Sequence, residues 1–297
     1  MLEYITFDLL AQLLINGILF GTSYGLAAIG LSLIFGTMRI IFLSQGAIII
    51  LMAYFCYSLF ASLTIDPYVS ILILLPGSLL LGAGIYNLLF RRATAMEDKN
   101  ISLLIAVGLM FLLENLMATV WSSDPVAIRT AYTAFGIKFM GLRISFTRLM
   151  GFVMAVLSTV GVTLFLKKTL VGKAVRAASK DMVAATLMGI TPHRVNAVAF
   201  AIGIGLSAIA GIALATTYSF DPYFGFIFSL KALIALALGG IGSVVGALLG
   251  GIILGVIESL AAFFISSGWS DAISYGVFLL VLMFRPEGLF VRSVKKA

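Results

Sequence analysis

Long apolar runs separated by short polar loops constrain this chain more than any other feature. A helix needs about 20 apolar residues to cross the hydrocarbon core of a bilayer. The composition agrees, since 62% of the 297 residues are hydrophobic and only 10% are charged. The sequence therefore predicts an all-α integral membrane protein, a polytopic helical bundle of about 8–10 spans. The expected spans lie near residues 9–35, 41–60, 68–90, 101–121, 147–166, 194–217, 243–264 and 272–290.

Lysine and arginine residues predict the orientation of these spans. They gather in three segments, 91–99, 167–194 and the tail after 284, and cytoplasmic loops are the usual place for such residues. We therefore expect a multi-pass membrane protein with its amino terminus outside and its C-terminus cytoplasmic. The acidic residues Glu3, Asp8, Asp66, Asp124, Asp221 and Asp271 then all fall on the outer side. The loop 122–147 is an exception, because it is expected outside and carries Arg129, Lys138 and Arg143.

One apolar stretch, "IFSLKALIALALGG" at 227–240, is short for a full crossing. If segment 167–194 and the tail are both cytoplasmic, an even number of crossings must separate them, yet only three clear spans follow residue 194. Segment 227–242 must then return the chain to the inner side as a short or broken helix. Backbone breaks at membrane depth are tolerated where protein buries them or a watery cavity receives them, and they often mark transport sites.

Several kinds of chemistry are excluded by residue counts and missing motifs. Cys56 and His193 are the only residues of their types, so one chain cannot assemble a disulfide, a zinc site or a Cys/His dyad. No GxxxxGK[ST] phosphate loop occurs, so the chain cannot hydrolyse ATP by that route. The net charge of +7 belongs to residues beside apolar spans, which indicates a lipid bilayer as partner and no nucleic acid. We expect no enzyme activity, cofactor or metal, and the acidic start without a cleavage pattern predicts that the first span is retained.

Glycines spaced four residues apart predict close helix packing. Small residues at this spacing let two helix backbones approach each other in a bilayer. The alternative is that these glycines line a pathway directly. The set comprises Gly17, Gly21 and Gly25 in one half of the chain and Gly242, Gly246 and Gly250 in the other, with Gly251 and Gly255 beside them.

Polar residues within the apolar runs are candidates for a substrate pathway. Ionisable groups in a span are costly and usually face the bundle interior or a cavity. Glu114 and Asn115 could instead hydrogen-bond a neighbouring helix, and Lys231 could extend its ammonium group towards the membrane surface. Glu258 lies deeper by the expected boundaries, which favours a functional role. The predicted pathway residues are Asn16, Ser44, Gln45, Glu114, Ser243 and Glu258.

The cytoplasmic stretch 172–190 predicts a short amphipathic helix between two spans. Lys173, Arg176 and Lys180 share one stripe, small residues prevail on the opposite side, and Gly189 can end the helix. Three alternatives are open for this stretch. It could be a helix whose cations contact anionic lipid head groups, a disordered basic loop, or a helix that docks into another protein. Small residues where a lipid-binding helix would carry large apolar ones favour a protein groove.

Several longer sequence patterns, taken in order, identify a known family. The most specific is "GKAVRAASKDMVAATLMGITPHRVNAVAFAIGIGLSAIAG". It is followed by "DPYFGF", "LGGIGSVVGALLGGIILGVIES" and "RPEGLF", and the N-terminal "NGILFGTSYGLAAIGLSLIFG" belongs to the same set. With these patterns, the sequence resembles the membrane permease subunits of branched-chain amino acid ABC importers along nearly its whole length.

This resemblance implies one transmembrane permease domain over residues 1–297 with a cytoplasmic coupling segment at 167–193. The implied partners are a second homologous permease subunit or an identical copy, two cytoplasmic ATPase subunits and an external solute-binding protein in a bacterial or archaeal inner membrane. The mechanism would be alternating access driven by the ATPases. The residues implied in ATPase coupling are Gly172, Lys173, Arg176, Lys180, Asp181, Ala185 and Gly189.

The chain departs from the family after the first span. Members commonly read Ile-Asn-Phe-Ala-His-Gly, whereas this chain has "IFLSQG" at 41–46, which replaces the Asn and the His. The departure keeps urea, short amides and other small solutes open beside branched-chain amino acids. Two further hypotheses from other classes are an ion-driven transporter or channel that uses Glu114 and Glu258, and a membrane-embedded enzyme.

Overall fold

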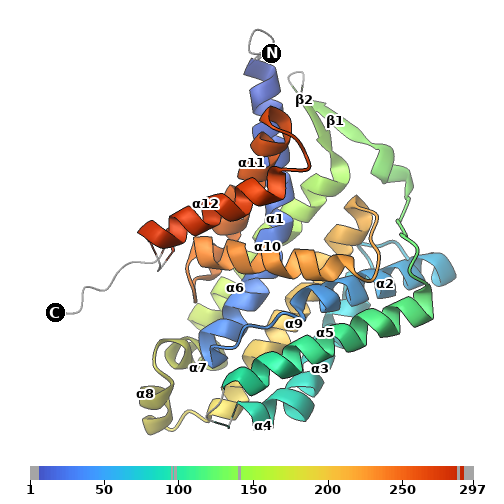
Figure 1. Ribbon diagram of the computed structural model, residues 1–297. Helices are drawn as coiled ribbons and strands as arrows, with labels where there is room; N and C mark the ends of the chain where they lie inside the picture. The colour runs from blue at the N-terminus through green and yellow to red at the C-terminus, as the bar shows by residue number, and fades with distance from the viewer. Residues whose placement is uncertain (1–6, 95, 97–98, 140–141, 286–287, 291–297) are drawn as a thin grey trace.

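The computed structural model describes residues 7–94, 96, 99–139, 142–285 and 288–290. Helices dominate, so the predicted all-α membrane fold is confirmed; a small two-stranded hairpin between α5 and α6 was not predicted (Figure 1). The helices are α1 (Phe7–Met38), α2 (Gln45–Leu63), α3 (Ile71–Ile85), α4 (Arg91–Ala93), α5 (Lys99–Trp121), α6 (Phe146–Lys168), α7 (Leu170–Lys180), α8 (Met182–Leu187), α9 (Pro192–Thr217), α10 (Phe224–Gly239), α11 (Val244–Phe264) and α12 (Ser270–Phe284). A π-helical turn (Tyr86–Phe90) joins α3 to α4, a 3-10 turn covers Ala131–Ala134, and β1 (Gly136–Phe139) pairs antiparallel with β2 (Leu142–Ser145).

Seven helices among the described residues are long and apolar enough to cross a membrane. They include α1, α2, α5, α6, α9 and α11, and the seventh runs from α3 through α4. Two more apolar helices, α10 and α12, are shorter. The expected span 272–290 is correspondingly shorter in the structure, because α12 ends at Phe284.

Helix α10 occupies the short apolar stretch for which a return crossing was predicted. It is a single 16-residue helix without an internal break, and its irregular backbone lies at both ends. Before it, Phe220 pairs with Val126 of the loop that follows α5. After it, Gly240 and Gly242 take φ angles of 94° and 80°, which favour glycine. A short helix is therefore present where one was predicted, at 224–239 instead of 227–242, and the return crossing by this segment stays a prediction.

The core forms where α1 meets α9, α10 and α11, with α2 packed against α9 and α10. Residues on these helices are buried almost all round, as in the run from Gly203 to Thr216. Helices α3, α5 and α6 instead expose large apolar side chains such as Leu72, Leu104 and Leu157. A helix that is apolar but exposed fits a lipid-facing position, so these helices form the periphery.

Glycines bring α1 and α11 into backbone contact in an antiparallel pair. A Cβ atom on Gly17 would lie 2.7 Å from the Val256 Cα, and one on Gly25 would lie 2.9 Å from the Leu248 carbonyl oxygen. Between them, Gly21 faces the Gly251 backbone. The absence of side chains therefore sets the separation of these two helices.

The second glycine set divides between two environments. Gly246 and Gly250 lie against Gly239 and Ala235 of α10, where an added Cβ would collide with backbone atoms. Gly242 is a correction to the predicted packing set, because it precedes α11 in a loop and a Cβ there would meet no atom within 4 Å. Its positive φ angle, not helix packing, accounts for glycine at this position.

The two ends of the bundle differ in the elements that they gather (Figure 1). We call one the hairpin end: the β1–β2 hairpin contacts the start of α1 there, since the Arg143 backbone N–H donates to Gln12 Oε1 over 2.8 Å. The other is the α7 end, where the last turn of α1 at Gly36 lies beside Ser179 of α7 and Gly242. The segment 288–290 joins the α7 end, because the Leu289 N–H donates to the Leu238 carbonyl oxygen over 2.8 Å.

Candidate functional site

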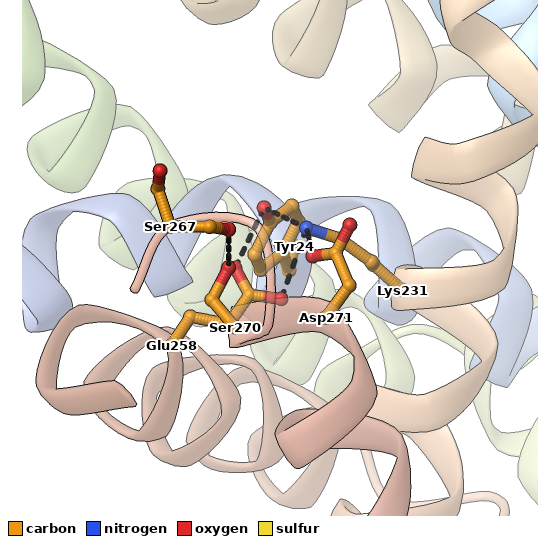
Figure 2. Close-up of polar contacts among 6 residues, drawn as sticks. All are labelled: Tyr24, Lys231, Glu258, Ser267, Ser270 and Asp271. Atoms are coloured by element: carbon orange, nitrogen blue, oxygen red, sulfur yellow. Dashed lines mark hydrogen bonds and ion pairs between the residues drawn. The ribbon is translucent and has the colours of Figure 1, made fainter. Parts of the chain in front are cut away.

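Three charged residues and a tyrosine meet in one polar cluster (Figure 2), beside a cavity that shares Asn16 and Arg148 with another cavity lined by the hairpin residues Arg143 and Ile144. We call Tyr24, Lys231, Glu258 and Asp271 the Lys231 cluster. The Lys231 Nζ lies 3.0 Å from Glu258 Oε1 and 2.8 Å from Asp271 Oδ1, and it donates to the Tyr24 hydroxyl over 3.2 Å. The same hydroxyl donates to Glu258 Oε2 over 3.0 Å. Four helices, α1, α10, α11 and α12, each supply one member.

Burial explains why these groups are paired. Lys231 and Glu258 are 8% and 6% exposed, and a charge taken out of water must be compensated by partners. Lys231 does not extend its ammonium group to the membrane surface, the alternative raised by its sequence position, because its nitrogen contacts two carboxylates. The Asp271 side chain is 49% exposed, so the cluster reaches solvent on one side. Two carboxylates and one ammonium group leave a net charge of −1.

A cavity of about 250 Å³ borders the cluster. Two of the predicted pathway residues, Asn16 and Glu258, line it together, although 242 positions separate them in the chain. The other lining residues are Phe20, Arg148, Lys231, Ser259, Ala262 and Ser270. The arrangement can bind a small polar solute through groups of both charges.

Ser44 and Gln45 lie apart from this cavity, where α1, α2 and α9 meet. Both are fully buried, and Ser44 Oγ donates to the Ala106 carbonyl oxygen of α5. Gln45 Nε2 donates to Ser207 Oγ of α9 over 2.8 Å, while its Oε1 has no partner among the described residues. These contacts join helices, and the pathway role of both residues stays a prediction.

Glu114 and Ser243 also lie away from the Lys231 cluster. Glu114 is 4% exposed on α5, a helix that packs mainly on α2. Ser243 begins α11 at the α7 end, where its Oγ accepts a hydrogen bond from the Gly246 N–H over 3.0 Å and caps the helix. Neither residue lines the cavity that Asn16 and Glu258 share, so their assignment to the pathway is untested.

The coupling segment contains two helices, which corrects the expectation of one continuous helix over 172–190. The break lies at Asp181, whose extended backbone ends α7 and begins α8. Its Oδ1 accepts hydrogen bonds from the N–H groups of Val183 and Ala184 over 2.9 and 3.0 Å. An aspartate in this position is a favourable N-cap, so the side chain itself explains the break.

Small residues hold these helices against the bundle. A Cβ on Gly172 would collide with the backbone at Phe165 and Leu166, so α7 can fold back on α6 only with glycine here. Ala185 is the buried residue of α8, and Gly189 ends the segment at a φ of 84°. Helix α7 contacts α1, α6 and α9. A displacement of α7 would therefore act on three helices of the bundle.

The outward side of the segment combines free charge with exposed apolar residues. Lys173, Arg176 and Lys180 are exposed, and with Lys167 and Ala177 they line a cavity of about 300 Å³. Within the described part of the chain, none of these cations has a carboxylate within 4.0 Å. The exposed apolar side chains are Leu170, Val171, Val183, Leu187 and Met188. Mixed surfaces of this kind are typical of protein interfaces.

Sequence reasoning missed four residues of the polar site. Lys231 was recognised as polar in an apolar run but not as the partner of Glu258, and Asp271 was placed only on the outer side. Tyr24 lies between two predicted packing glycines, and Arg148 lies next to a basic loop; nothing in the local pattern separates either from its neighbours. Pairing across four helices could be found only from their arrangement in space.

Comparison with known proteins shows to which family the chain belongs. The sequence profile described as "Branched-chain amino acid transport system / permease component" matches residues 13–282, which is most of the chain. The chain belongs to this permease family. The match begins inside α1 and ends inside α12, so it includes the polar cavity and the coupling segment.

Individual relatives align with this chain over nearly their full lengths. The high-affinity branched-chain amino acid transport system permease protein BraD of Pseudomonas aeruginosa is 32% identical over 293 residues, covering 95% of each chain. The corresponding permease protein LivH of Salmonella typhimurium is 30% identical over 295 residues, also covering 95% of each chain.

A more distant likeness covers part of the chain. The autoinducer 2 import system permease protein LsrC of Salmonella paratyphi B is 35% identical over 127 residues, covering 40% of this chain and 37% of LsrC. No solved protein structure matches the chain at a significant level.

Proposed function

We propose that this protein is the permease subunit of an ABC importer for branched-chain or similar small amino acids. The observation that carries the proposal is the full-length similarity to BraD and LivH, whose names state that transport system. The helices, the polar cavity and the coupling segment form one transmembrane permease domain over residues 1–297. A second permease subunit, or another copy of this chain, would complete the transmembrane part.

The α7–α8 segment is the proposed docking surface for two cytoplasmic ATPase subunits. Its unpaired cations and exposed apolar residues offer a partner both charge and apolar area. The proposed coupling residues fall into two groups. One group shapes the segment: Gly172, Asp181, Ala185 and Gly189. The other group faces outward: Lys173, Arg176 and Lys180. Because α7 contacts α1, α6 and α9, movement of the ATPases would bias the bundle between outward-facing and inward-facing packings.

The hairpin end is the proposed outer face, where an external solute-binding protein would deliver the solute. Asp66 and Asp221 lie beside the segment between α5 and α6 that carries the hairpin, and Asp124 lies in that segment: the Tyr132 hydroxyl donates to Asp66, and Val126 pairs with Phe220. This proximity supports the outer placement that the sequence pattern predicts for all three. The contact of segment 288–290 with the α7 end supports a cytoplasmic C-terminus in a bacterial or archaeal inner membrane. The tail residues Arg292, Lys295 and Lys296, on which that orientation also rests, lie outside the described residues.

The solute would enter through the cavity beside the Lys231 cluster, with Asn16 and Glu258 on its wall. Ser44, Gln45, Glu114 and Ser243 remain proposed members of the path at other depths. The chain would contribute no chemistry of its own, since alternating access needs only packing changes driven by the partners.

Charge reversal at the coupling segment tests the proposal. In cells that express the complete importer, Arg176→Glu and Asp181→Lys should each abolish leucine uptake because the ATPases no longer dock productively. Arg176→Lys is the matched control and should retain uptake. All variants should reach the membrane in wild-type amounts, as measured by quantitative blotting. Normal uptake in both charge-reversed variants would remove the coupling assignment.

Co-purification separates an ATP-driven importer from an ion-driven transporter. Stable association with an ATPase pair and ATP-dependent uptake in proteoliposomes would support the proposal. Uptake by the isolated chain under an ion gradient would instead support use of Glu258 as an ion site. Competition of leucine uptake by urea and by short amides would test the alternative solutes.

A further inference from the structure

Three cavities at the hairpin end meet at one side chain, Arg148. It lines the cavity of about 250 Å³ beside the Lys231 cluster. It also lines a neighbouring cavity of about 240 Å³ that includes Arg129 and Tyr218, and an open one of about 620 Å³ that includes Gln12 and Arg143. Arg148 lies in the first turn of α6, so the rigid helix fixes its position. A solute that enters from this end passes the guanidinium group.

The charge of Arg148 has no partner within the described residues. In the described part of the chain, no carboxylate lies within 4.0 Å of its guanidinium group, and the group donates no hydrogen bond. Its electrostatic neighbour is Tyr218: burial raises the pKa of this hydroxyl, and the positive charge of Arg148 partly offsets the rise. A tyrosine with a raised pKa stays neutral and cannot neutralise the guanidinium. Arg148 therefore presents an unsatisfied positive charge to the cavity.

The Lys231 cluster, which borders the same cavity through Lys231 and Glu258, carries the complementary charge. In the Lys231 cluster, Glu258 and Asp271 outnumber Lys231, which leaves a surplus negative charge. Lys231 already contacts both carboxylates, so it is not free to take a third. Arg148 is free, and a guanidinium binds a carboxylate through two parallel hydrogen bonds.

A zwitterionic amino acid matches this pattern of charges. Its α-carboxylate needs a cation and its α-ammonium needs an anion, and one cavity offers Arg148 and Glu258 for these tasks. Phe20 and Ala262 supply apolar wall for a side chain. The volume lies below the roughly 300–1,000 Å³ of drug-sized ligand sites, which fits a small solute.

We propose that Arg148 binds the α-carboxylate of the transported amino acid in this cavity, with Glu258 facing the α-ammonium group. This inference rests on the proposed import of amino acids. It goes beyond that function by assigning a recognition site to the permease itself, in addition to the selection made by an external binding protein.

Uptake kinetics test the role of Arg148. The complete importer is reconstituted with leucine-loaded binding protein, and the maximal rate is measured for wild type, Arg148→Gln, Arg148→Lys and Arg143→Gln. Loss of a charged hydrogen bond should lower the maximal rate of Arg148→Gln by about 10- to 100-fold. The binding-protein concentration for half-maximal uptake should stay unchanged, because docking is intact. Arg148→Lys should restore part of the rate, and Arg143→Gln, an exposed arginine of the outermost cavity, should transport normally.

Cysteine labelling gives a readout that a purely structural role of Arg148 would not change. Cys56, the only cysteine, is buried and is replaced by alanine, and Ala262→Cys then places a thiol on the cavity wall. Leucine at high concentration should slow labelling by a methanethiosulfonate reagent, whereas 3-methylbutylamine, which lacks the carboxylate, should not. Adding Arg148→Gln should abolish the protection by leucine.

The possible outcomes separate the two proposals. If the wild-type importer moves leucine but Arg148→Gln transports as fast and keeps the protection, the recognition site is wrong and the importer function stands. If the wild-type complex moves no amino acid at all, the proposed function fails and the recognition site fails with it.

Discussion

The buried lysine of α10 and the basic stripe of α7 show two uses of the same chemistry in one chain. Lys231 is 8% exposed and contacts Glu258 and Asp271, so its charge is compensated within the bundle. Lys173 and Arg176 are exposed and have no carboxylate partner among the described residues. Water can solvate Lys173 and Arg176, whereas a buried and charged Lys231 needs carboxylate partners that are buried beside it.

This difference separates residues that we expect to stabilise the bundle from residues that we expect to contact another chain. The charges of the Lys231 cluster are fixed by contacts between four helices, so their removal should damage the bundle itself. The charges of the α7 stripe contact nothing that the bundle needs, and their removal should damage only an interaction with another chain. Three variants, from the largest expected effect on stability to the smallest, would sharpen or break this contrast.

Loss of the buried cation should have the largest effect. Lys231→Met leaves the Glu258 carboxylate buried without its cation, a change that typically costs about 3–5 kcal/mol. The thermal transition of the detergent-solubilised protein, followed by fluorescence-detected size exclusion, should fall accordingly. The double variant Lys231→Met/Glu258→Gln is the control: without charge to compensate, it should regain most of the stability but not the uptake. A stable single variant would show that the cluster does not hold the helices together.

Loss of the cap between α7 and α8 should have an intermediate and local effect. Asp181→Ala removes the acceptor for the N–H groups of Val183 and Ala184, which should cost about 1 kcal/mol. Hydrogen exchange at these two amides should accelerate while exchange in α9 stays unchanged. Asp181→Asn keeps the cap without the charge and should exchange like the wild type. Equal exchange in all three proteins would contradict the capping role.

Loss of the exposed stripe should have the smallest effect on stability and a large one on uptake. Exposed substitutions usually change stability by less than about 0.5 kcal/mol. The triple variant Lys173→Ala/Arg176→Ala/Lys180→Ala should therefore unfold at the wild-type temperature in the same assay, yet lose ATP-driven uptake. A large drop in its unfolding temperature would erase the contrast with Lys231.

Hydropathy predicted the helical architecture because the length of an apolar run depends only on local composition. The short length of α10 was also visible in the sequence, whereas its role as a return crossing stays a prediction. The break between α7 and α8 at Asp181 was not predicted. The spacing of Lys173, Arg176 and Lys180 fits one continuous helix, and only the structure shows that Asp181 caps the next helix. The hairpin was also missed, since strands of four residues leave little periodic pattern.

The polar site was predicted in part. Glu258 and Asn16 were identified because polar groups in apolar runs are rare, and the structure brings them to one cavity. Their relation to Arg148 and to Lys231 depends on contacts between distant helices, which a single sequence does not encode in any local spacing. Gln45 was identified from a departure from the family pattern, but its contact with Ser207 required the packed structure.

The glycine contact between α1 and α11 limits how the bundle can change shape. Because their backbones touch over several turns, sliding one helix past the other would force glycine backbones onto bulkier neighbours such as Leu248. Helices α1 and α11 should therefore move together as one rigid body, which keeps Tyr24 and Glu258 in contact. If the α7–α8 segment moves as proposed, the pair would carry that movement to the cavity beside the Lys231 cluster as a rigid-body rotation, and bending would be confined to segments outside the pair.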